Sequence, residues 1–355
     1  MYAISLPALT VFIISFILSL AAVAIVLRLS NRKKWFDPTD DRKIHRGNIP
    51  RLGGIGFALA FMLVALGVSI VTPGYESNLR YVPCFIALLV ILVFGVYDDF
   101  RPLAPRYKLI VQVVAALIVI IPGFAFRRIA YIGADILPGP LGFIITLFWI
   151  VGLTNAVNLI DGLDGLAGGV SGIIAVFLGL IFFFFGSNTQ LVLFCAAFVG
   201  VILGFLVFNA PLPKAKIFMG DCGSQFLGFL LALLPLLEHA NYPAALPVLY
   251  AAALLLIPIL DTVAAVWRRI RDKKGISVPD MSHVHHKLMN LGLSVRGVNT
   301  VLCGLQILLG ALVFISIRLS GMASLYVLGI AYIIGTAFFS TVHFMNRAAN
   351  KAKNK

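Results

Sequence analysis

Charge is scarce in this chain, and glutamate is nearly missing from it. Asp, Glu, Lys and Arg together make up 12% of the 355 residues, against about a quarter in a typical soluble domain. Only 14 residues are acidic, and just two of them, Glu76 and Glu238, are glutamate. So little charge, with 61% hydrophobic residues and a mean hydropathy of +1.02, excludes an ordinary soluble domain and indicates a protein of the lipid bilayer.

Cysteine is also rare, and its placement argues against a cysteine-based metal site. Cys84, Cys195 and Cys303 fall within apolar runs and Cys222 within a polar loop, without the paired spacing of metal ligands. We interpret all four as structural thiols. The sequence also lacks a convincing internal repeat, so it indicates a single membrane domain.

Apolar runs long enough to cross about 30 Å of hydrocarbon recur along the chain. The eleven runs are residues 5–27, 53–72, 81–97, 108–125, 140–157, 168–186, 190–208, 224–237, 246–267, 299–317 and 323–343. The run at 224–237 is the shortest, and such a run also fits a re-entrant or buried helix, which leaves ten crossings as an alternative. The predicted fold class is an all-α integral membrane protein with about 11 transmembrane helices.

The basic residues predict how these helices are oriented. With eleven crossings, 24 of the 28 Lys and Arg residues fall on one side, and such an excess marks the cytoplasmic side. The amino terminus is then outside and the carboxyl terminus cytoplasmic. The net charge of +14 is mostly this topology signal and is no evidence for nucleic-acid binding.

We divide the chain into one polytopic transmembrane domain, residues 1–345, and a basic cytoplasmic tail, residues 346–355. The cytoplasmic loops of the domain are expected at about 28–52, 98–108, 158–168, 209–224 and 268–298. None is long enough for an independent domain. Any chemistry must therefore be built on the inner face of the membrane.

The acidic residues gather on this same face. Under the predicted topology 11 of the 14 fall on the cytoplasmic side, in its loops or toward the cytoplasmic end of a run, and all 11 are aspartate. Several of these aspartates lie at the ends of apolar runs. An unpaired charge is costly there and usually faces a protein interior or a water-filled cavity. A short carboxylate also suits a hard cation such as magnesium held against phosphate oxygens. Helix capping and pairing with basic residues is the alternative, but it explains one aspartate more easily than a cluster.

The first motif is an aspartate pair, Asp98 and Asp99, which closes the third run just before Lys108 begins the fourth. Adjacent carboxylates repel each other, so keeping both ionised requires a cation or a phosphate-bound partner. Lys108 supplies a charge that can bind phosphate, although an ordinary positive-inside flank explains it as well. An Asp-Asp pair alone is weakly specific.

The second motif, Asn-Ala-Val-Asn-Leu-Ile-Asp-Gly-Leu-Asp-Gly-Leu, is more specific. Its polar side chains recur at every third position, at Asn155, Asn158, Asp161 and Asp164. They would form a drifting stripe on one side of a helix end, and the glycines permit a turn and the close approach of a ligand. Capping could explain one of these residues but hardly all four.

The third motif joins Asn209 to Phe-Met-Gly-Asp-Cys-Gly-Ser, which carries Phe218 and Asp221 and leads into the eighth run. In a Gly-Asp-x-Gly-Ser turn, backbone N–H groups and the following helix N-terminus can face an anion while Asp221 holds a metal ion beside it. A simple N-cap is the alternative.

The fourth motif is a histidine cluster: His283, His285 and His286 fall within four positions. If residues 279–292 form a short helix, it would lie on the membrane with His283 and His286 on one face. Such a cluster binds phosphate when protonated or donates N–H bonds when neutral. A zinc site is the rival, disfavoured because no cysteine is near and the carboxylates favour a harder ion.

The fifth motif is a basic stretch that opens the second run. It reads Asp-Arg-Lys-Ile-His-Arg-Gly-Asn-Ile-Pro-Arg-Leu-Gly-Gly and includes Arg46 and Arg51. Basic groups before a Pro-Arg-x-Gly-Gly turn suit an anionic lipid headgroup or a pyrophosphate, although positive-inside topology explains most of the charge.

Taken in chain order, the five motifs resemble the polyprenyl-phosphate N-acetylhexosamine-1-phosphate transferase family over about residues 37–296. The resemblance implies a fold of ten or eleven membrane helices, dependence on magnesium or manganese, and transfer of a sugar 1-phosphate to a polyprenyl phosphate with release of UMP. The domain of residues 1–345 would then be catalytic, in the bacterial cytoplasmic (inner) membrane, with its active site on the cytoplasmic face.

The resemblance also assigns roles to the matched positions. The catalytic residues would be Asp98, Asp99, Asp221 and His283, with Asp221 and Asp98 as metal ligands. The substrate-binding residues would be Arg46, Arg51, Lys108, Asn155, Asn158, Asp161, Asp164, Asn209, Phe218, His285 and His286.

The histidine motif favours one branch of this family. Phospho-MurNAc-pentapeptide translocases generally carry a His-His-His-Phe-Glu type sequence here, whereas this chain has His-Val-His-His-Lys-Leu-Met. That is similar to the branch that uses UDP-N-acetylglucosamine and undecaprenyl phosphate to begin O-antigen, common antigen, teichoic acid or related glycans. The translocase stays the alternative. Membrane lipids are further expected partners, and a homodimer is left open.

Two more distant classes of membrane protein also use aspartate side chains to bind ions. A membrane prenyltransferase also holds magnesium and diphosphate through Asn and Asp at short spacing, but it needs a second aspartate-rich motif that we do not find. A secondary transporter binds coupling ions near the middle of the membrane, whereas these aspartates mark the ends of runs. Both fit the sequence less well than the transferase.

Overall fold

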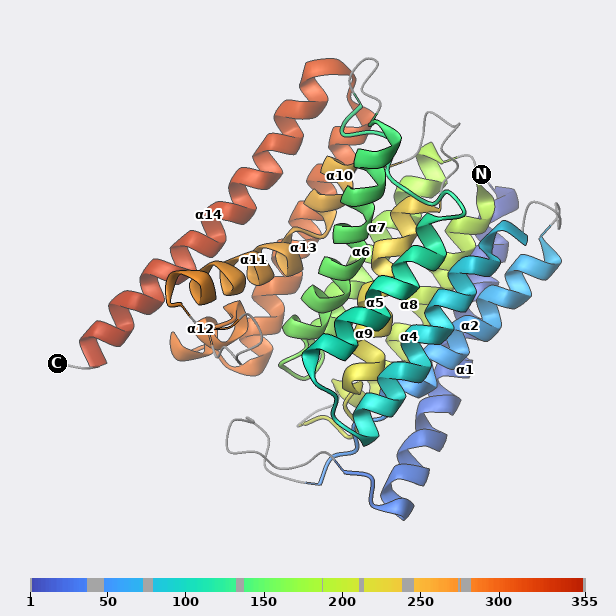
Figure 1. Ribbon diagram of the computed structural model, residues 1–355, viewed down its shortest axis with the longest axis horizontal. Helices are drawn as coiled ribbons and strands as arrows, with labels where there is room; N and C mark the ends of the chain where they lie inside the picture. The colour runs from blue at the N-terminus through green and yellow to red at the C-terminus, as the bar shows by residue number, and fades with distance from the viewer. Residues whose placement is uncertain are drawn as a thin grey trace.

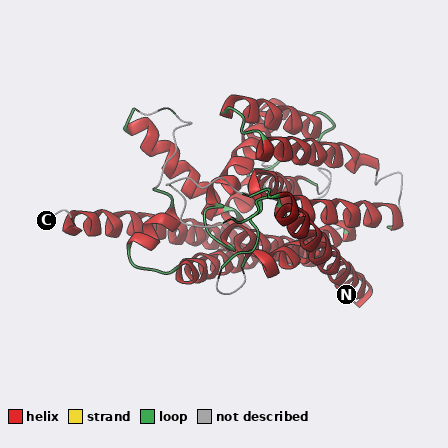
Figure 2. Ribbon diagram, turned by 90° about the horizontal axis from the view of Figure 1, so that it is seen from below, coloured by secondary structure: helices red, strands yellow, loops and turns green. Residues whose placement is uncertain are grey.

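The computed structural model describes residues 2–36, 48–72, 79–131, 137–186, 188–210, 214–237, 246–273, 275 and 282–353. These residues form a bundle of helices and no strand; Phe36 and Pro50 form an isolated bridge (Figures 1 and 2). The longer helices are α1 (Tyr2–Lys33), α2 (Gly53–Val71), α4 (Val82–Phe100), α5 (Pro105–Ile120), α6 (Gly139–Ile160), α7 (Leu166–Phe185), α8 (Thr189–Asn209), α9 (Gly220–Leu233), α11 (Leu256–Arg271), α13 (Val295–Arg318) and α14 (Gly321–Lys353). The shorter ones are η1 (Leu79–Tyr81), η2 (Leu234–Leu236), α10 (Val248–Leu254) and α12 (Val284–Asn290).

Each of the eleven predicted apolar runs is helical over most of its length. In the described ranges eight helices are long and apolar enough to cross a membrane, and a ninth crossing is obtained if α10 and α11 count as one span. The expectation of an all-helical, multi-pass membrane protein is therefore confirmed. The count of eleven crossings and their orientation stay predictions.

The run predicted at 246–267 is not one straight helix. It breaks at Leu255 into α10 and α11, which meet at an angle of 87°. Pro258 lies in the first turn of α11; a proline has no backbone N–H, and its ring clashes with the carbonyl four residues earlier, which here belongs to Leu254, the last residue of α10. The chain therefore turns, and α11 runs outward from the end of α10 toward α14 (Figure 1).

The shortest predicted run forms the most deeply buried helix. Every residue of α9 and η2 from Cys222 to Leu236 is buried, and α2, α4 and α6 pack around α9 in the middle of the bundle (Figure 1). Because protein surrounds α9, its length does not have to match the thickness of the hydrocarbon. Its first turn carries Asp221, so the packing of α9 decides where that carboxylate lies.

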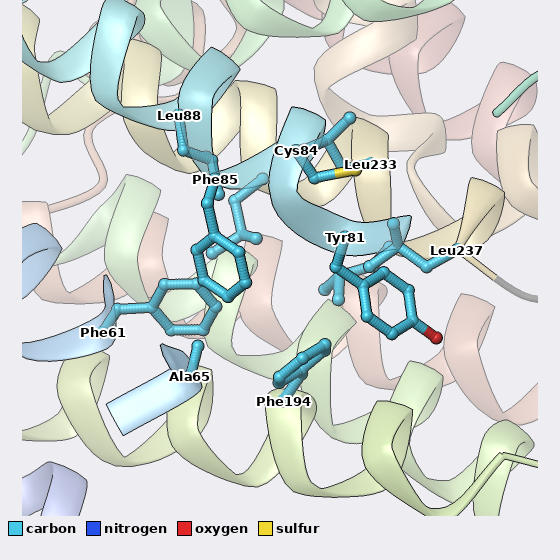
Figure 3. A pocket seen from close by; sticks show the side chains of 11 residues that line it. Phe61, Ala65, Tyr81, Cys84, Phe85, Leu88, Phe194, Leu233 and Leu237 are labelled. Atoms are coloured by element: carbon cyan, nitrogen blue, oxygen red, sulfur yellow. The ribbon is translucent and has the colours of Figure 1, made fainter. Parts of the chain in front are cut away.

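An apolar pocket lies among α2, α4, α8 and α9, lined by side chains that include Phe61, Cys84 and Leu233 (Figure 3). Tyr81 forms part of its wall, and the hydroxyl of Tyr81 accepts hydrogen bonds from Arg80 (2.6 Å) and Asn188 (2.7 Å). Tyr81 precedes the first turn of α4 and the aspartate pair ends α4. The pocket is therefore at the opposite end of that helix from the predicted site.

Two glycines let neighbouring helices come close to the first turn of α9. A Cβ on Gly54 would lie 2.3 Å from the Cα of Gly223, and a Cβ on Gly95 would lie 2.5 Å from the Cα of Cys222. The N–H of Gly54 also donates to the carbonyl of Met219 at 2.9 Å. Backbone thus packs directly on backbone where α2 and α4 meet α9.

We expect Gly54→Ala to destabilise the protein, because the added methyl group collides with backbone atoms that cannot rotate away. Overpacking of this kind costs about 1–3 kcal/mol or more. The matched control is Gly67→Ala on the same helix, where an added Cβ meets no atom within 4 Å. Thermal unfolding in detergent should show a clearly lower transition temperature for Gly54→Ala only; equal transitions would contradict the packing argument.

Candidate active site

Four helix ends bring the predicted aspartate motifs together at one end of the bundle. Asp98 and Asp99 lie in the last turn of α4, and Lys108 lies in the first turn of α5. Asn158 lies in the last turn of α6, and Asp221 lies in the first turn of α9. Because the terminal turns of helices leave backbone groups unpaired, this end of the bundle gathers both side-chain and backbone polar groups.

Lys108 is the central cation of the cluster. Its ammonium lies 2.6 Å from Oδ2 of Asp221 and also contacts Oδ2 of Asp98. The Asp98 side chain is almost fully buried, so its charge has to be neutralised inside the protein. One lysine thus holds together carboxylates that are more than a hundred residues apart in the sequence.

Asp99 binds the beginning of α9. Its two carboxylate oxygens accept hydrogen bonds from the backbone N–H groups of Asp221 (2.9 Å) and Cys222 (3.1 Å). A carboxylate is favoured at a helix N-terminus, where N–H groups are unpaired and the helix dipole is positive. The arrangement needs Gly220, whose φ is +70°; a Cβ there would lie 2.2 Å from the carbonyl oxygen of Arg51 and 2.7 Å from Oδ2 of Asp99. Asp99 therefore fixes where Asp221 lies.

Asn158 orients the other side of Asp221. Its amide nitrogen lies 3.0 Å from Oδ1 of Asp221 and 2.7 Å from Oγ of Ser224. Asn155 lies one helical turn deeper, where it forms two hydrogen bonds with Gln112 (2.7 and 3.4 Å). Gln112 also donates to Gln225 at 3.1 Å. The structure thus places Asn158 at the carboxylates and Asn155 in a polar layer beneath them.

The loop at residues 161–165 carries the remaining two predicted aspartates. Asp164 accepts a hydrogen bond from the N–H of Ala215 (3.0 Å), and Gly165 supports the turn with a φ of +79°. Burial, together with the charges of Asp221, Asp164 and Asp99, raises the pKa of Asp161 to about 8. The rise comes first from burial and then from the neighbouring carboxylates, which disfavour a further negative charge.

Asn209 and Phe218 hold the loop that precedes α9. Buried Asn209 accepts from the N–H of Gly165 (2.9 Å) and donates to the carbonyl of Ile217 (2.9 Å), so it ties two segments of the site together. The backbone of Phe218 pairs with Pro50 (2.8 Å) and Gly53 (2.9 Å). The polar atoms of Asn209 are committed to backbone, which supports a structural role beside the predicted one in substrate binding.

The histidine cluster meets the aspartate motifs through His285. The ring of His285 is buried, neither ring nitrogen has a hydrogen-bond partner, and Nε2 is 2.4 Å from where a Cβ on Gly162 would be. The ring of His285 is parallel to that of His283, with centroids 5.8 Å apart, and lies 4.3 Å from that of His286. Burial and the neighbouring His286 lower the pKa of His285 to about 3.

The basic stretch reaches the site through Arg51, whose Nε lies 4.0 Å from Oδ1 of Asp99. Arg46 lies outside the described residues. Within the described ranges no group of three His, Cys, Asp or Glu residues is positioned to hold a metal ion by itself. Magnesium and the zinc alternative both stay predictions. Sequence reasoning missed Gln225, and it missed Asp261, which contacts His283 at 2.7 Å.

The fold and the site together define a multi-pass membrane protein with a carboxylate-rich site at one end of its helix bundle. Residues 81–238 match glycosyl transferase family 4. The chain is 33% identical, over 80% of its length, to a probable undecaprenyl-phosphate N-acetylglucosaminyl 1-phosphate transferase of Bacillus subtilis (strain 168), of which 78% is covered. It is 30% and 28% identical to the undecaprenyl-phosphate alpha-N-acetylglucosaminyl 1-phosphate transferases of Salmonella typhi and Escherichia coli (strain K12), in each case over 73% of this chain and 70% of the relative.

The chain therefore belongs to glycosyl transferase family 4, and the family resemblance inferred from its motifs is confirmed. The family match includes the aspartate pair, Lys108, the second motif and the third motif. The histidine cluster lies beyond it in the sequence, and the structure joins it to the rest through the contact of His285 with Gly162.

We expect the native state to lose stability as the pH falls below the ordinary histidine value of 6.5, partly because of His285. The unfolded chain takes up a proton there, whereas the buried ring resists protonation down to about pH 3. This difference is worth up to about 1.4 kcal/mol for each pH unit between the two values. Melting temperatures measured in detergent between about pH 7 and pH 5 should fall less steeply for His285→Gln than for the parent protein. Parallel curves would contradict the assignment.

Proposed function

We propose that the protein transfers N-acetylglucosamine 1-phosphate from UDP-N-acetylglucosamine to undecaprenyl phosphate and releases UMP. The observation that carries the proposal is the cluster of Asp98, Lys108 and Asp221 at the end of an apolar bundle in a member of this transferase family. A lipid carrier keeps its chain in the bilayer, because exposing each CH₂ to water costs about 0.8 kcal/mol. The nucleotide sugar therefore has to come to the membrane face.

In this reaction an oxygen of the lipid phosphate attacks the β-phosphorus of the nucleotide sugar. A new phosphorus–oxygen bond forms, and the bond from the β-phosphorus to the bridging oxygen breaks, so that UMP leaves with that oxygen. The main barrier is the approach of two anions, which an enzyme lowers through positioning and electrostatic stabilisation. Lys108 is suited to both tasks because its ammonium is held in place by two carboxylates.

We assign the residues according to their contacts. Asp98 and Lys108 would receive the lipid phosphate, and Asp99 would keep Asp221 in place through the amides that begin α9. The loop at residues 161–165 and His285 would line the nucleotide side, where they touch. His283 and His286 would bind phosphate or sugar oxygens.

A hard divalent cation fits this set of donors. The ammonium of Lys108 already draws carboxylate oxygens of Asp98 and Asp221 onto one positive charge. Magnesium is commonly held by one or two carboxylates together with substrate phosphates, so Asp221 and Asp98 would hold it, and manganese suits the same oxygen donors. The bound ion would neutralise phosphate charge during transfer.

The proposed setting is the bacterial cytoplasmic membrane, with the site on the cytoplasmic face and eleven crossings. It is supported by the basic last turns of α1 and α14, which lie toward the same side of the bundle as the C-terminus, away from the N-terminus (Figure 1). The product would begin a cell-envelope glycan such as O-antigen, common antigen or teichoic acid.

The proposal is tested with purified protein, undecaprenyl phosphate, magnesium and UDP-N-acetylglucosamine, scored by UMP release. We expect release that depends on the lipid, and we expect Asp221→Asn to lower it by at least about 10²–10³-fold, the usual effect of losing an electrostatic contact to the reacting group. Asp272→Asn is the matched control, because Asp272 is an exposed aspartate at the end of α11.

The outcomes separate the alternatives. Full activity of Asp221→Asn would reject the role of that residue. Release only with UDP-MurNAc-pentapeptide would favour the translocase reaction. Uptake of substrate into proteoliposomes without UMP release would favour a transporter, and no lipid-dependent release with any UDP-amino sugar would reject the proposed function.

Removal of divalent cations gives a separate prediction. We expect EDTA to abolish UMP release and magnesium or manganese to restore it, because hard oxygen donors select such ions. Undiminished activity in EDTA, or restoration by zinc alone, would contradict the proposed cofactor. The Asp221→Asn variant should need a higher magnesium concentration for any residual activity.

A further inference from the structure

Asp261 is a buried carboxylate that the proposed reaction does not use. It lies on α11, is 2% exposed, and contacts the beginning of the histidine helix α12. Its Oδ1 accepts the N–H of Val284 at 2.8 Å, and its Oδ2 lies 2.7 Å from Nδ1 of His283. Both contacts are made at the beginning of α12, where His283 is the residue before the first helical turn.

This geometry does more than cap a helix. An N–H bond to Val284 requires only an acceptor, which an asparagine or serine also provides. The second oxygen contacts an imidazole nitrogen, and an ionised carboxylate there requires that nitrogen to carry a proton. In the neutral ring the other nitrogen, Nε2, is then an acceptor. Carboxylates placed in this way fix the tautomer and the ring orientation of functional histidines.

The contacts continue from His283 toward the site. Its ring is parallel to that of His285 within 4°, and His285 lies against Gly162 in the loop that carries Asp161 and Asp164. One ring, that of His285, therefore lies between His283 and this loop. The bend at Leu255 turns α11 away from the direction of α10 and so allows a carboxylate of this helix to reach α12.

We propose that Asp261 is a positioning residue that holds His283 with its Nδ1–H on the carboxylate and leaves Nε2 to accept a proton or a hydrogen bond from the substrate. The inference rests on the proposed function, in which His283 binds phosphate or sugar oxygens: an unprotonated Nε2 accepts from a sugar hydroxyl, and it donates to a phosphate oxygen only after it has taken up a proton. Asp261 itself does not touch the substrate; it acts through His283.

The first test is Asp261→Asn, which keeps the size of the side chain and its acceptor for Val284. The amide can, however, offer an N–H to Nδ1 and so favour the opposite tautomer of His283. We expect lipid-dependent UMP release to fall by about 10–100-fold, the usual effect of removing the group that orients a functional histidine, while the melting temperature stays close to that of the parent. Asp272→Asn, the exposed aspartate at the end of the same helix, should keep full activity.

A double-mutant cycle separates positioning from a general structural effect. In a His283→Gln background, Asp261→Asn should cause little further loss, because the residue through which it acts is gone. An equal fold-loss in both backgrounds, or full activity of Asp261→Asn alone, would overturn the inference. Radiolabelled sugar transferred to lipid provides the sensitivity that the weaker variants require.

A second measurement needs neither activity nor a variant of Asp261. In protein labelled with ¹⁵N-histidine, the ring-nitrogen chemical shifts of His283, assigned by their loss in His283→Gln, should report a protonated Nδ1 and an unprotonated Nε2 at a pH at which the ring is neutral. The opposite tautomer would overturn the inference even if Asp261→Asn fails to fold. A parent protein that lacks UMP release but shows this tautomer would reject the proposed function and leave the pairing of Asp261 with His283 intact.

Discussion

The site depends on the neutralisation of buried carboxylates at the ends of membrane helices. Asp98 is nearly fully buried, and its charge is neutralised by the ammonium of Lys108, which also pairs with Asp221. The carboxylate of Asp99 accepts hydrogen bonds from the first N–H groups of α9. A buried charge without such partners would destabilise the fold by several kcal/mol, so the packing of these helices and the placement of the carboxylates determine each other.

That mutual dependence explains why glycines cluster around the start of α9. Asp99 can reach the backbone amides of α9 only if α4 packs closely against α9. Gly95 permits this packing because it has no side chain where α4 contacts Cys222. Gly54 does the same for α2, and Gly220 leaves room for the carboxylate itself. The electrostatics of the site is therefore built on backbone contacts that a side chain would prevent.

Much of this architecture could be predicted from the sequence, because length and hydropathy report directly on bilayer crossing. The exceptions have physical causes. The apolar run that forms α9 looks too short because its length is compared with the thickness of the hydrocarbon layer. α9 is surrounded by protein and does not need to match that thickness. The bend at Leu255 follows from Pro258, but a proline in an apolar run is also compatible with a mild kink, and only the packing of α11 decides the angle.

The residues of the site were easier to predict than their partners. Regular spacing singled out Asn155, Asn158, Asp161 and Asp164, but spacing does not say that Asn155 pairs with Gln112 rather than with the carboxylates. Asp261 was missed because it belongs to no motif and its partner is 22 residues away. The available signal was a single carboxylate within an apolar run, which is costly unless it is paired and so indicates a function or a buried partner.

The charges of the described site bear on the proposed divalent cation. Among the described residues, the carboxylates of Asp98, Asp99 and Asp221 share the two cations Lys108 and Arg51. Burial and the neighbouring carboxylates also raise the pKa of Asp161, to about 8. Such a site would repel two phosphate-bearing substrates. If phosphates are the substrates, they must bring or meet additional positive charge, which is the physical reason for proposing that Asp221 and Asp98 hold a divalent cation.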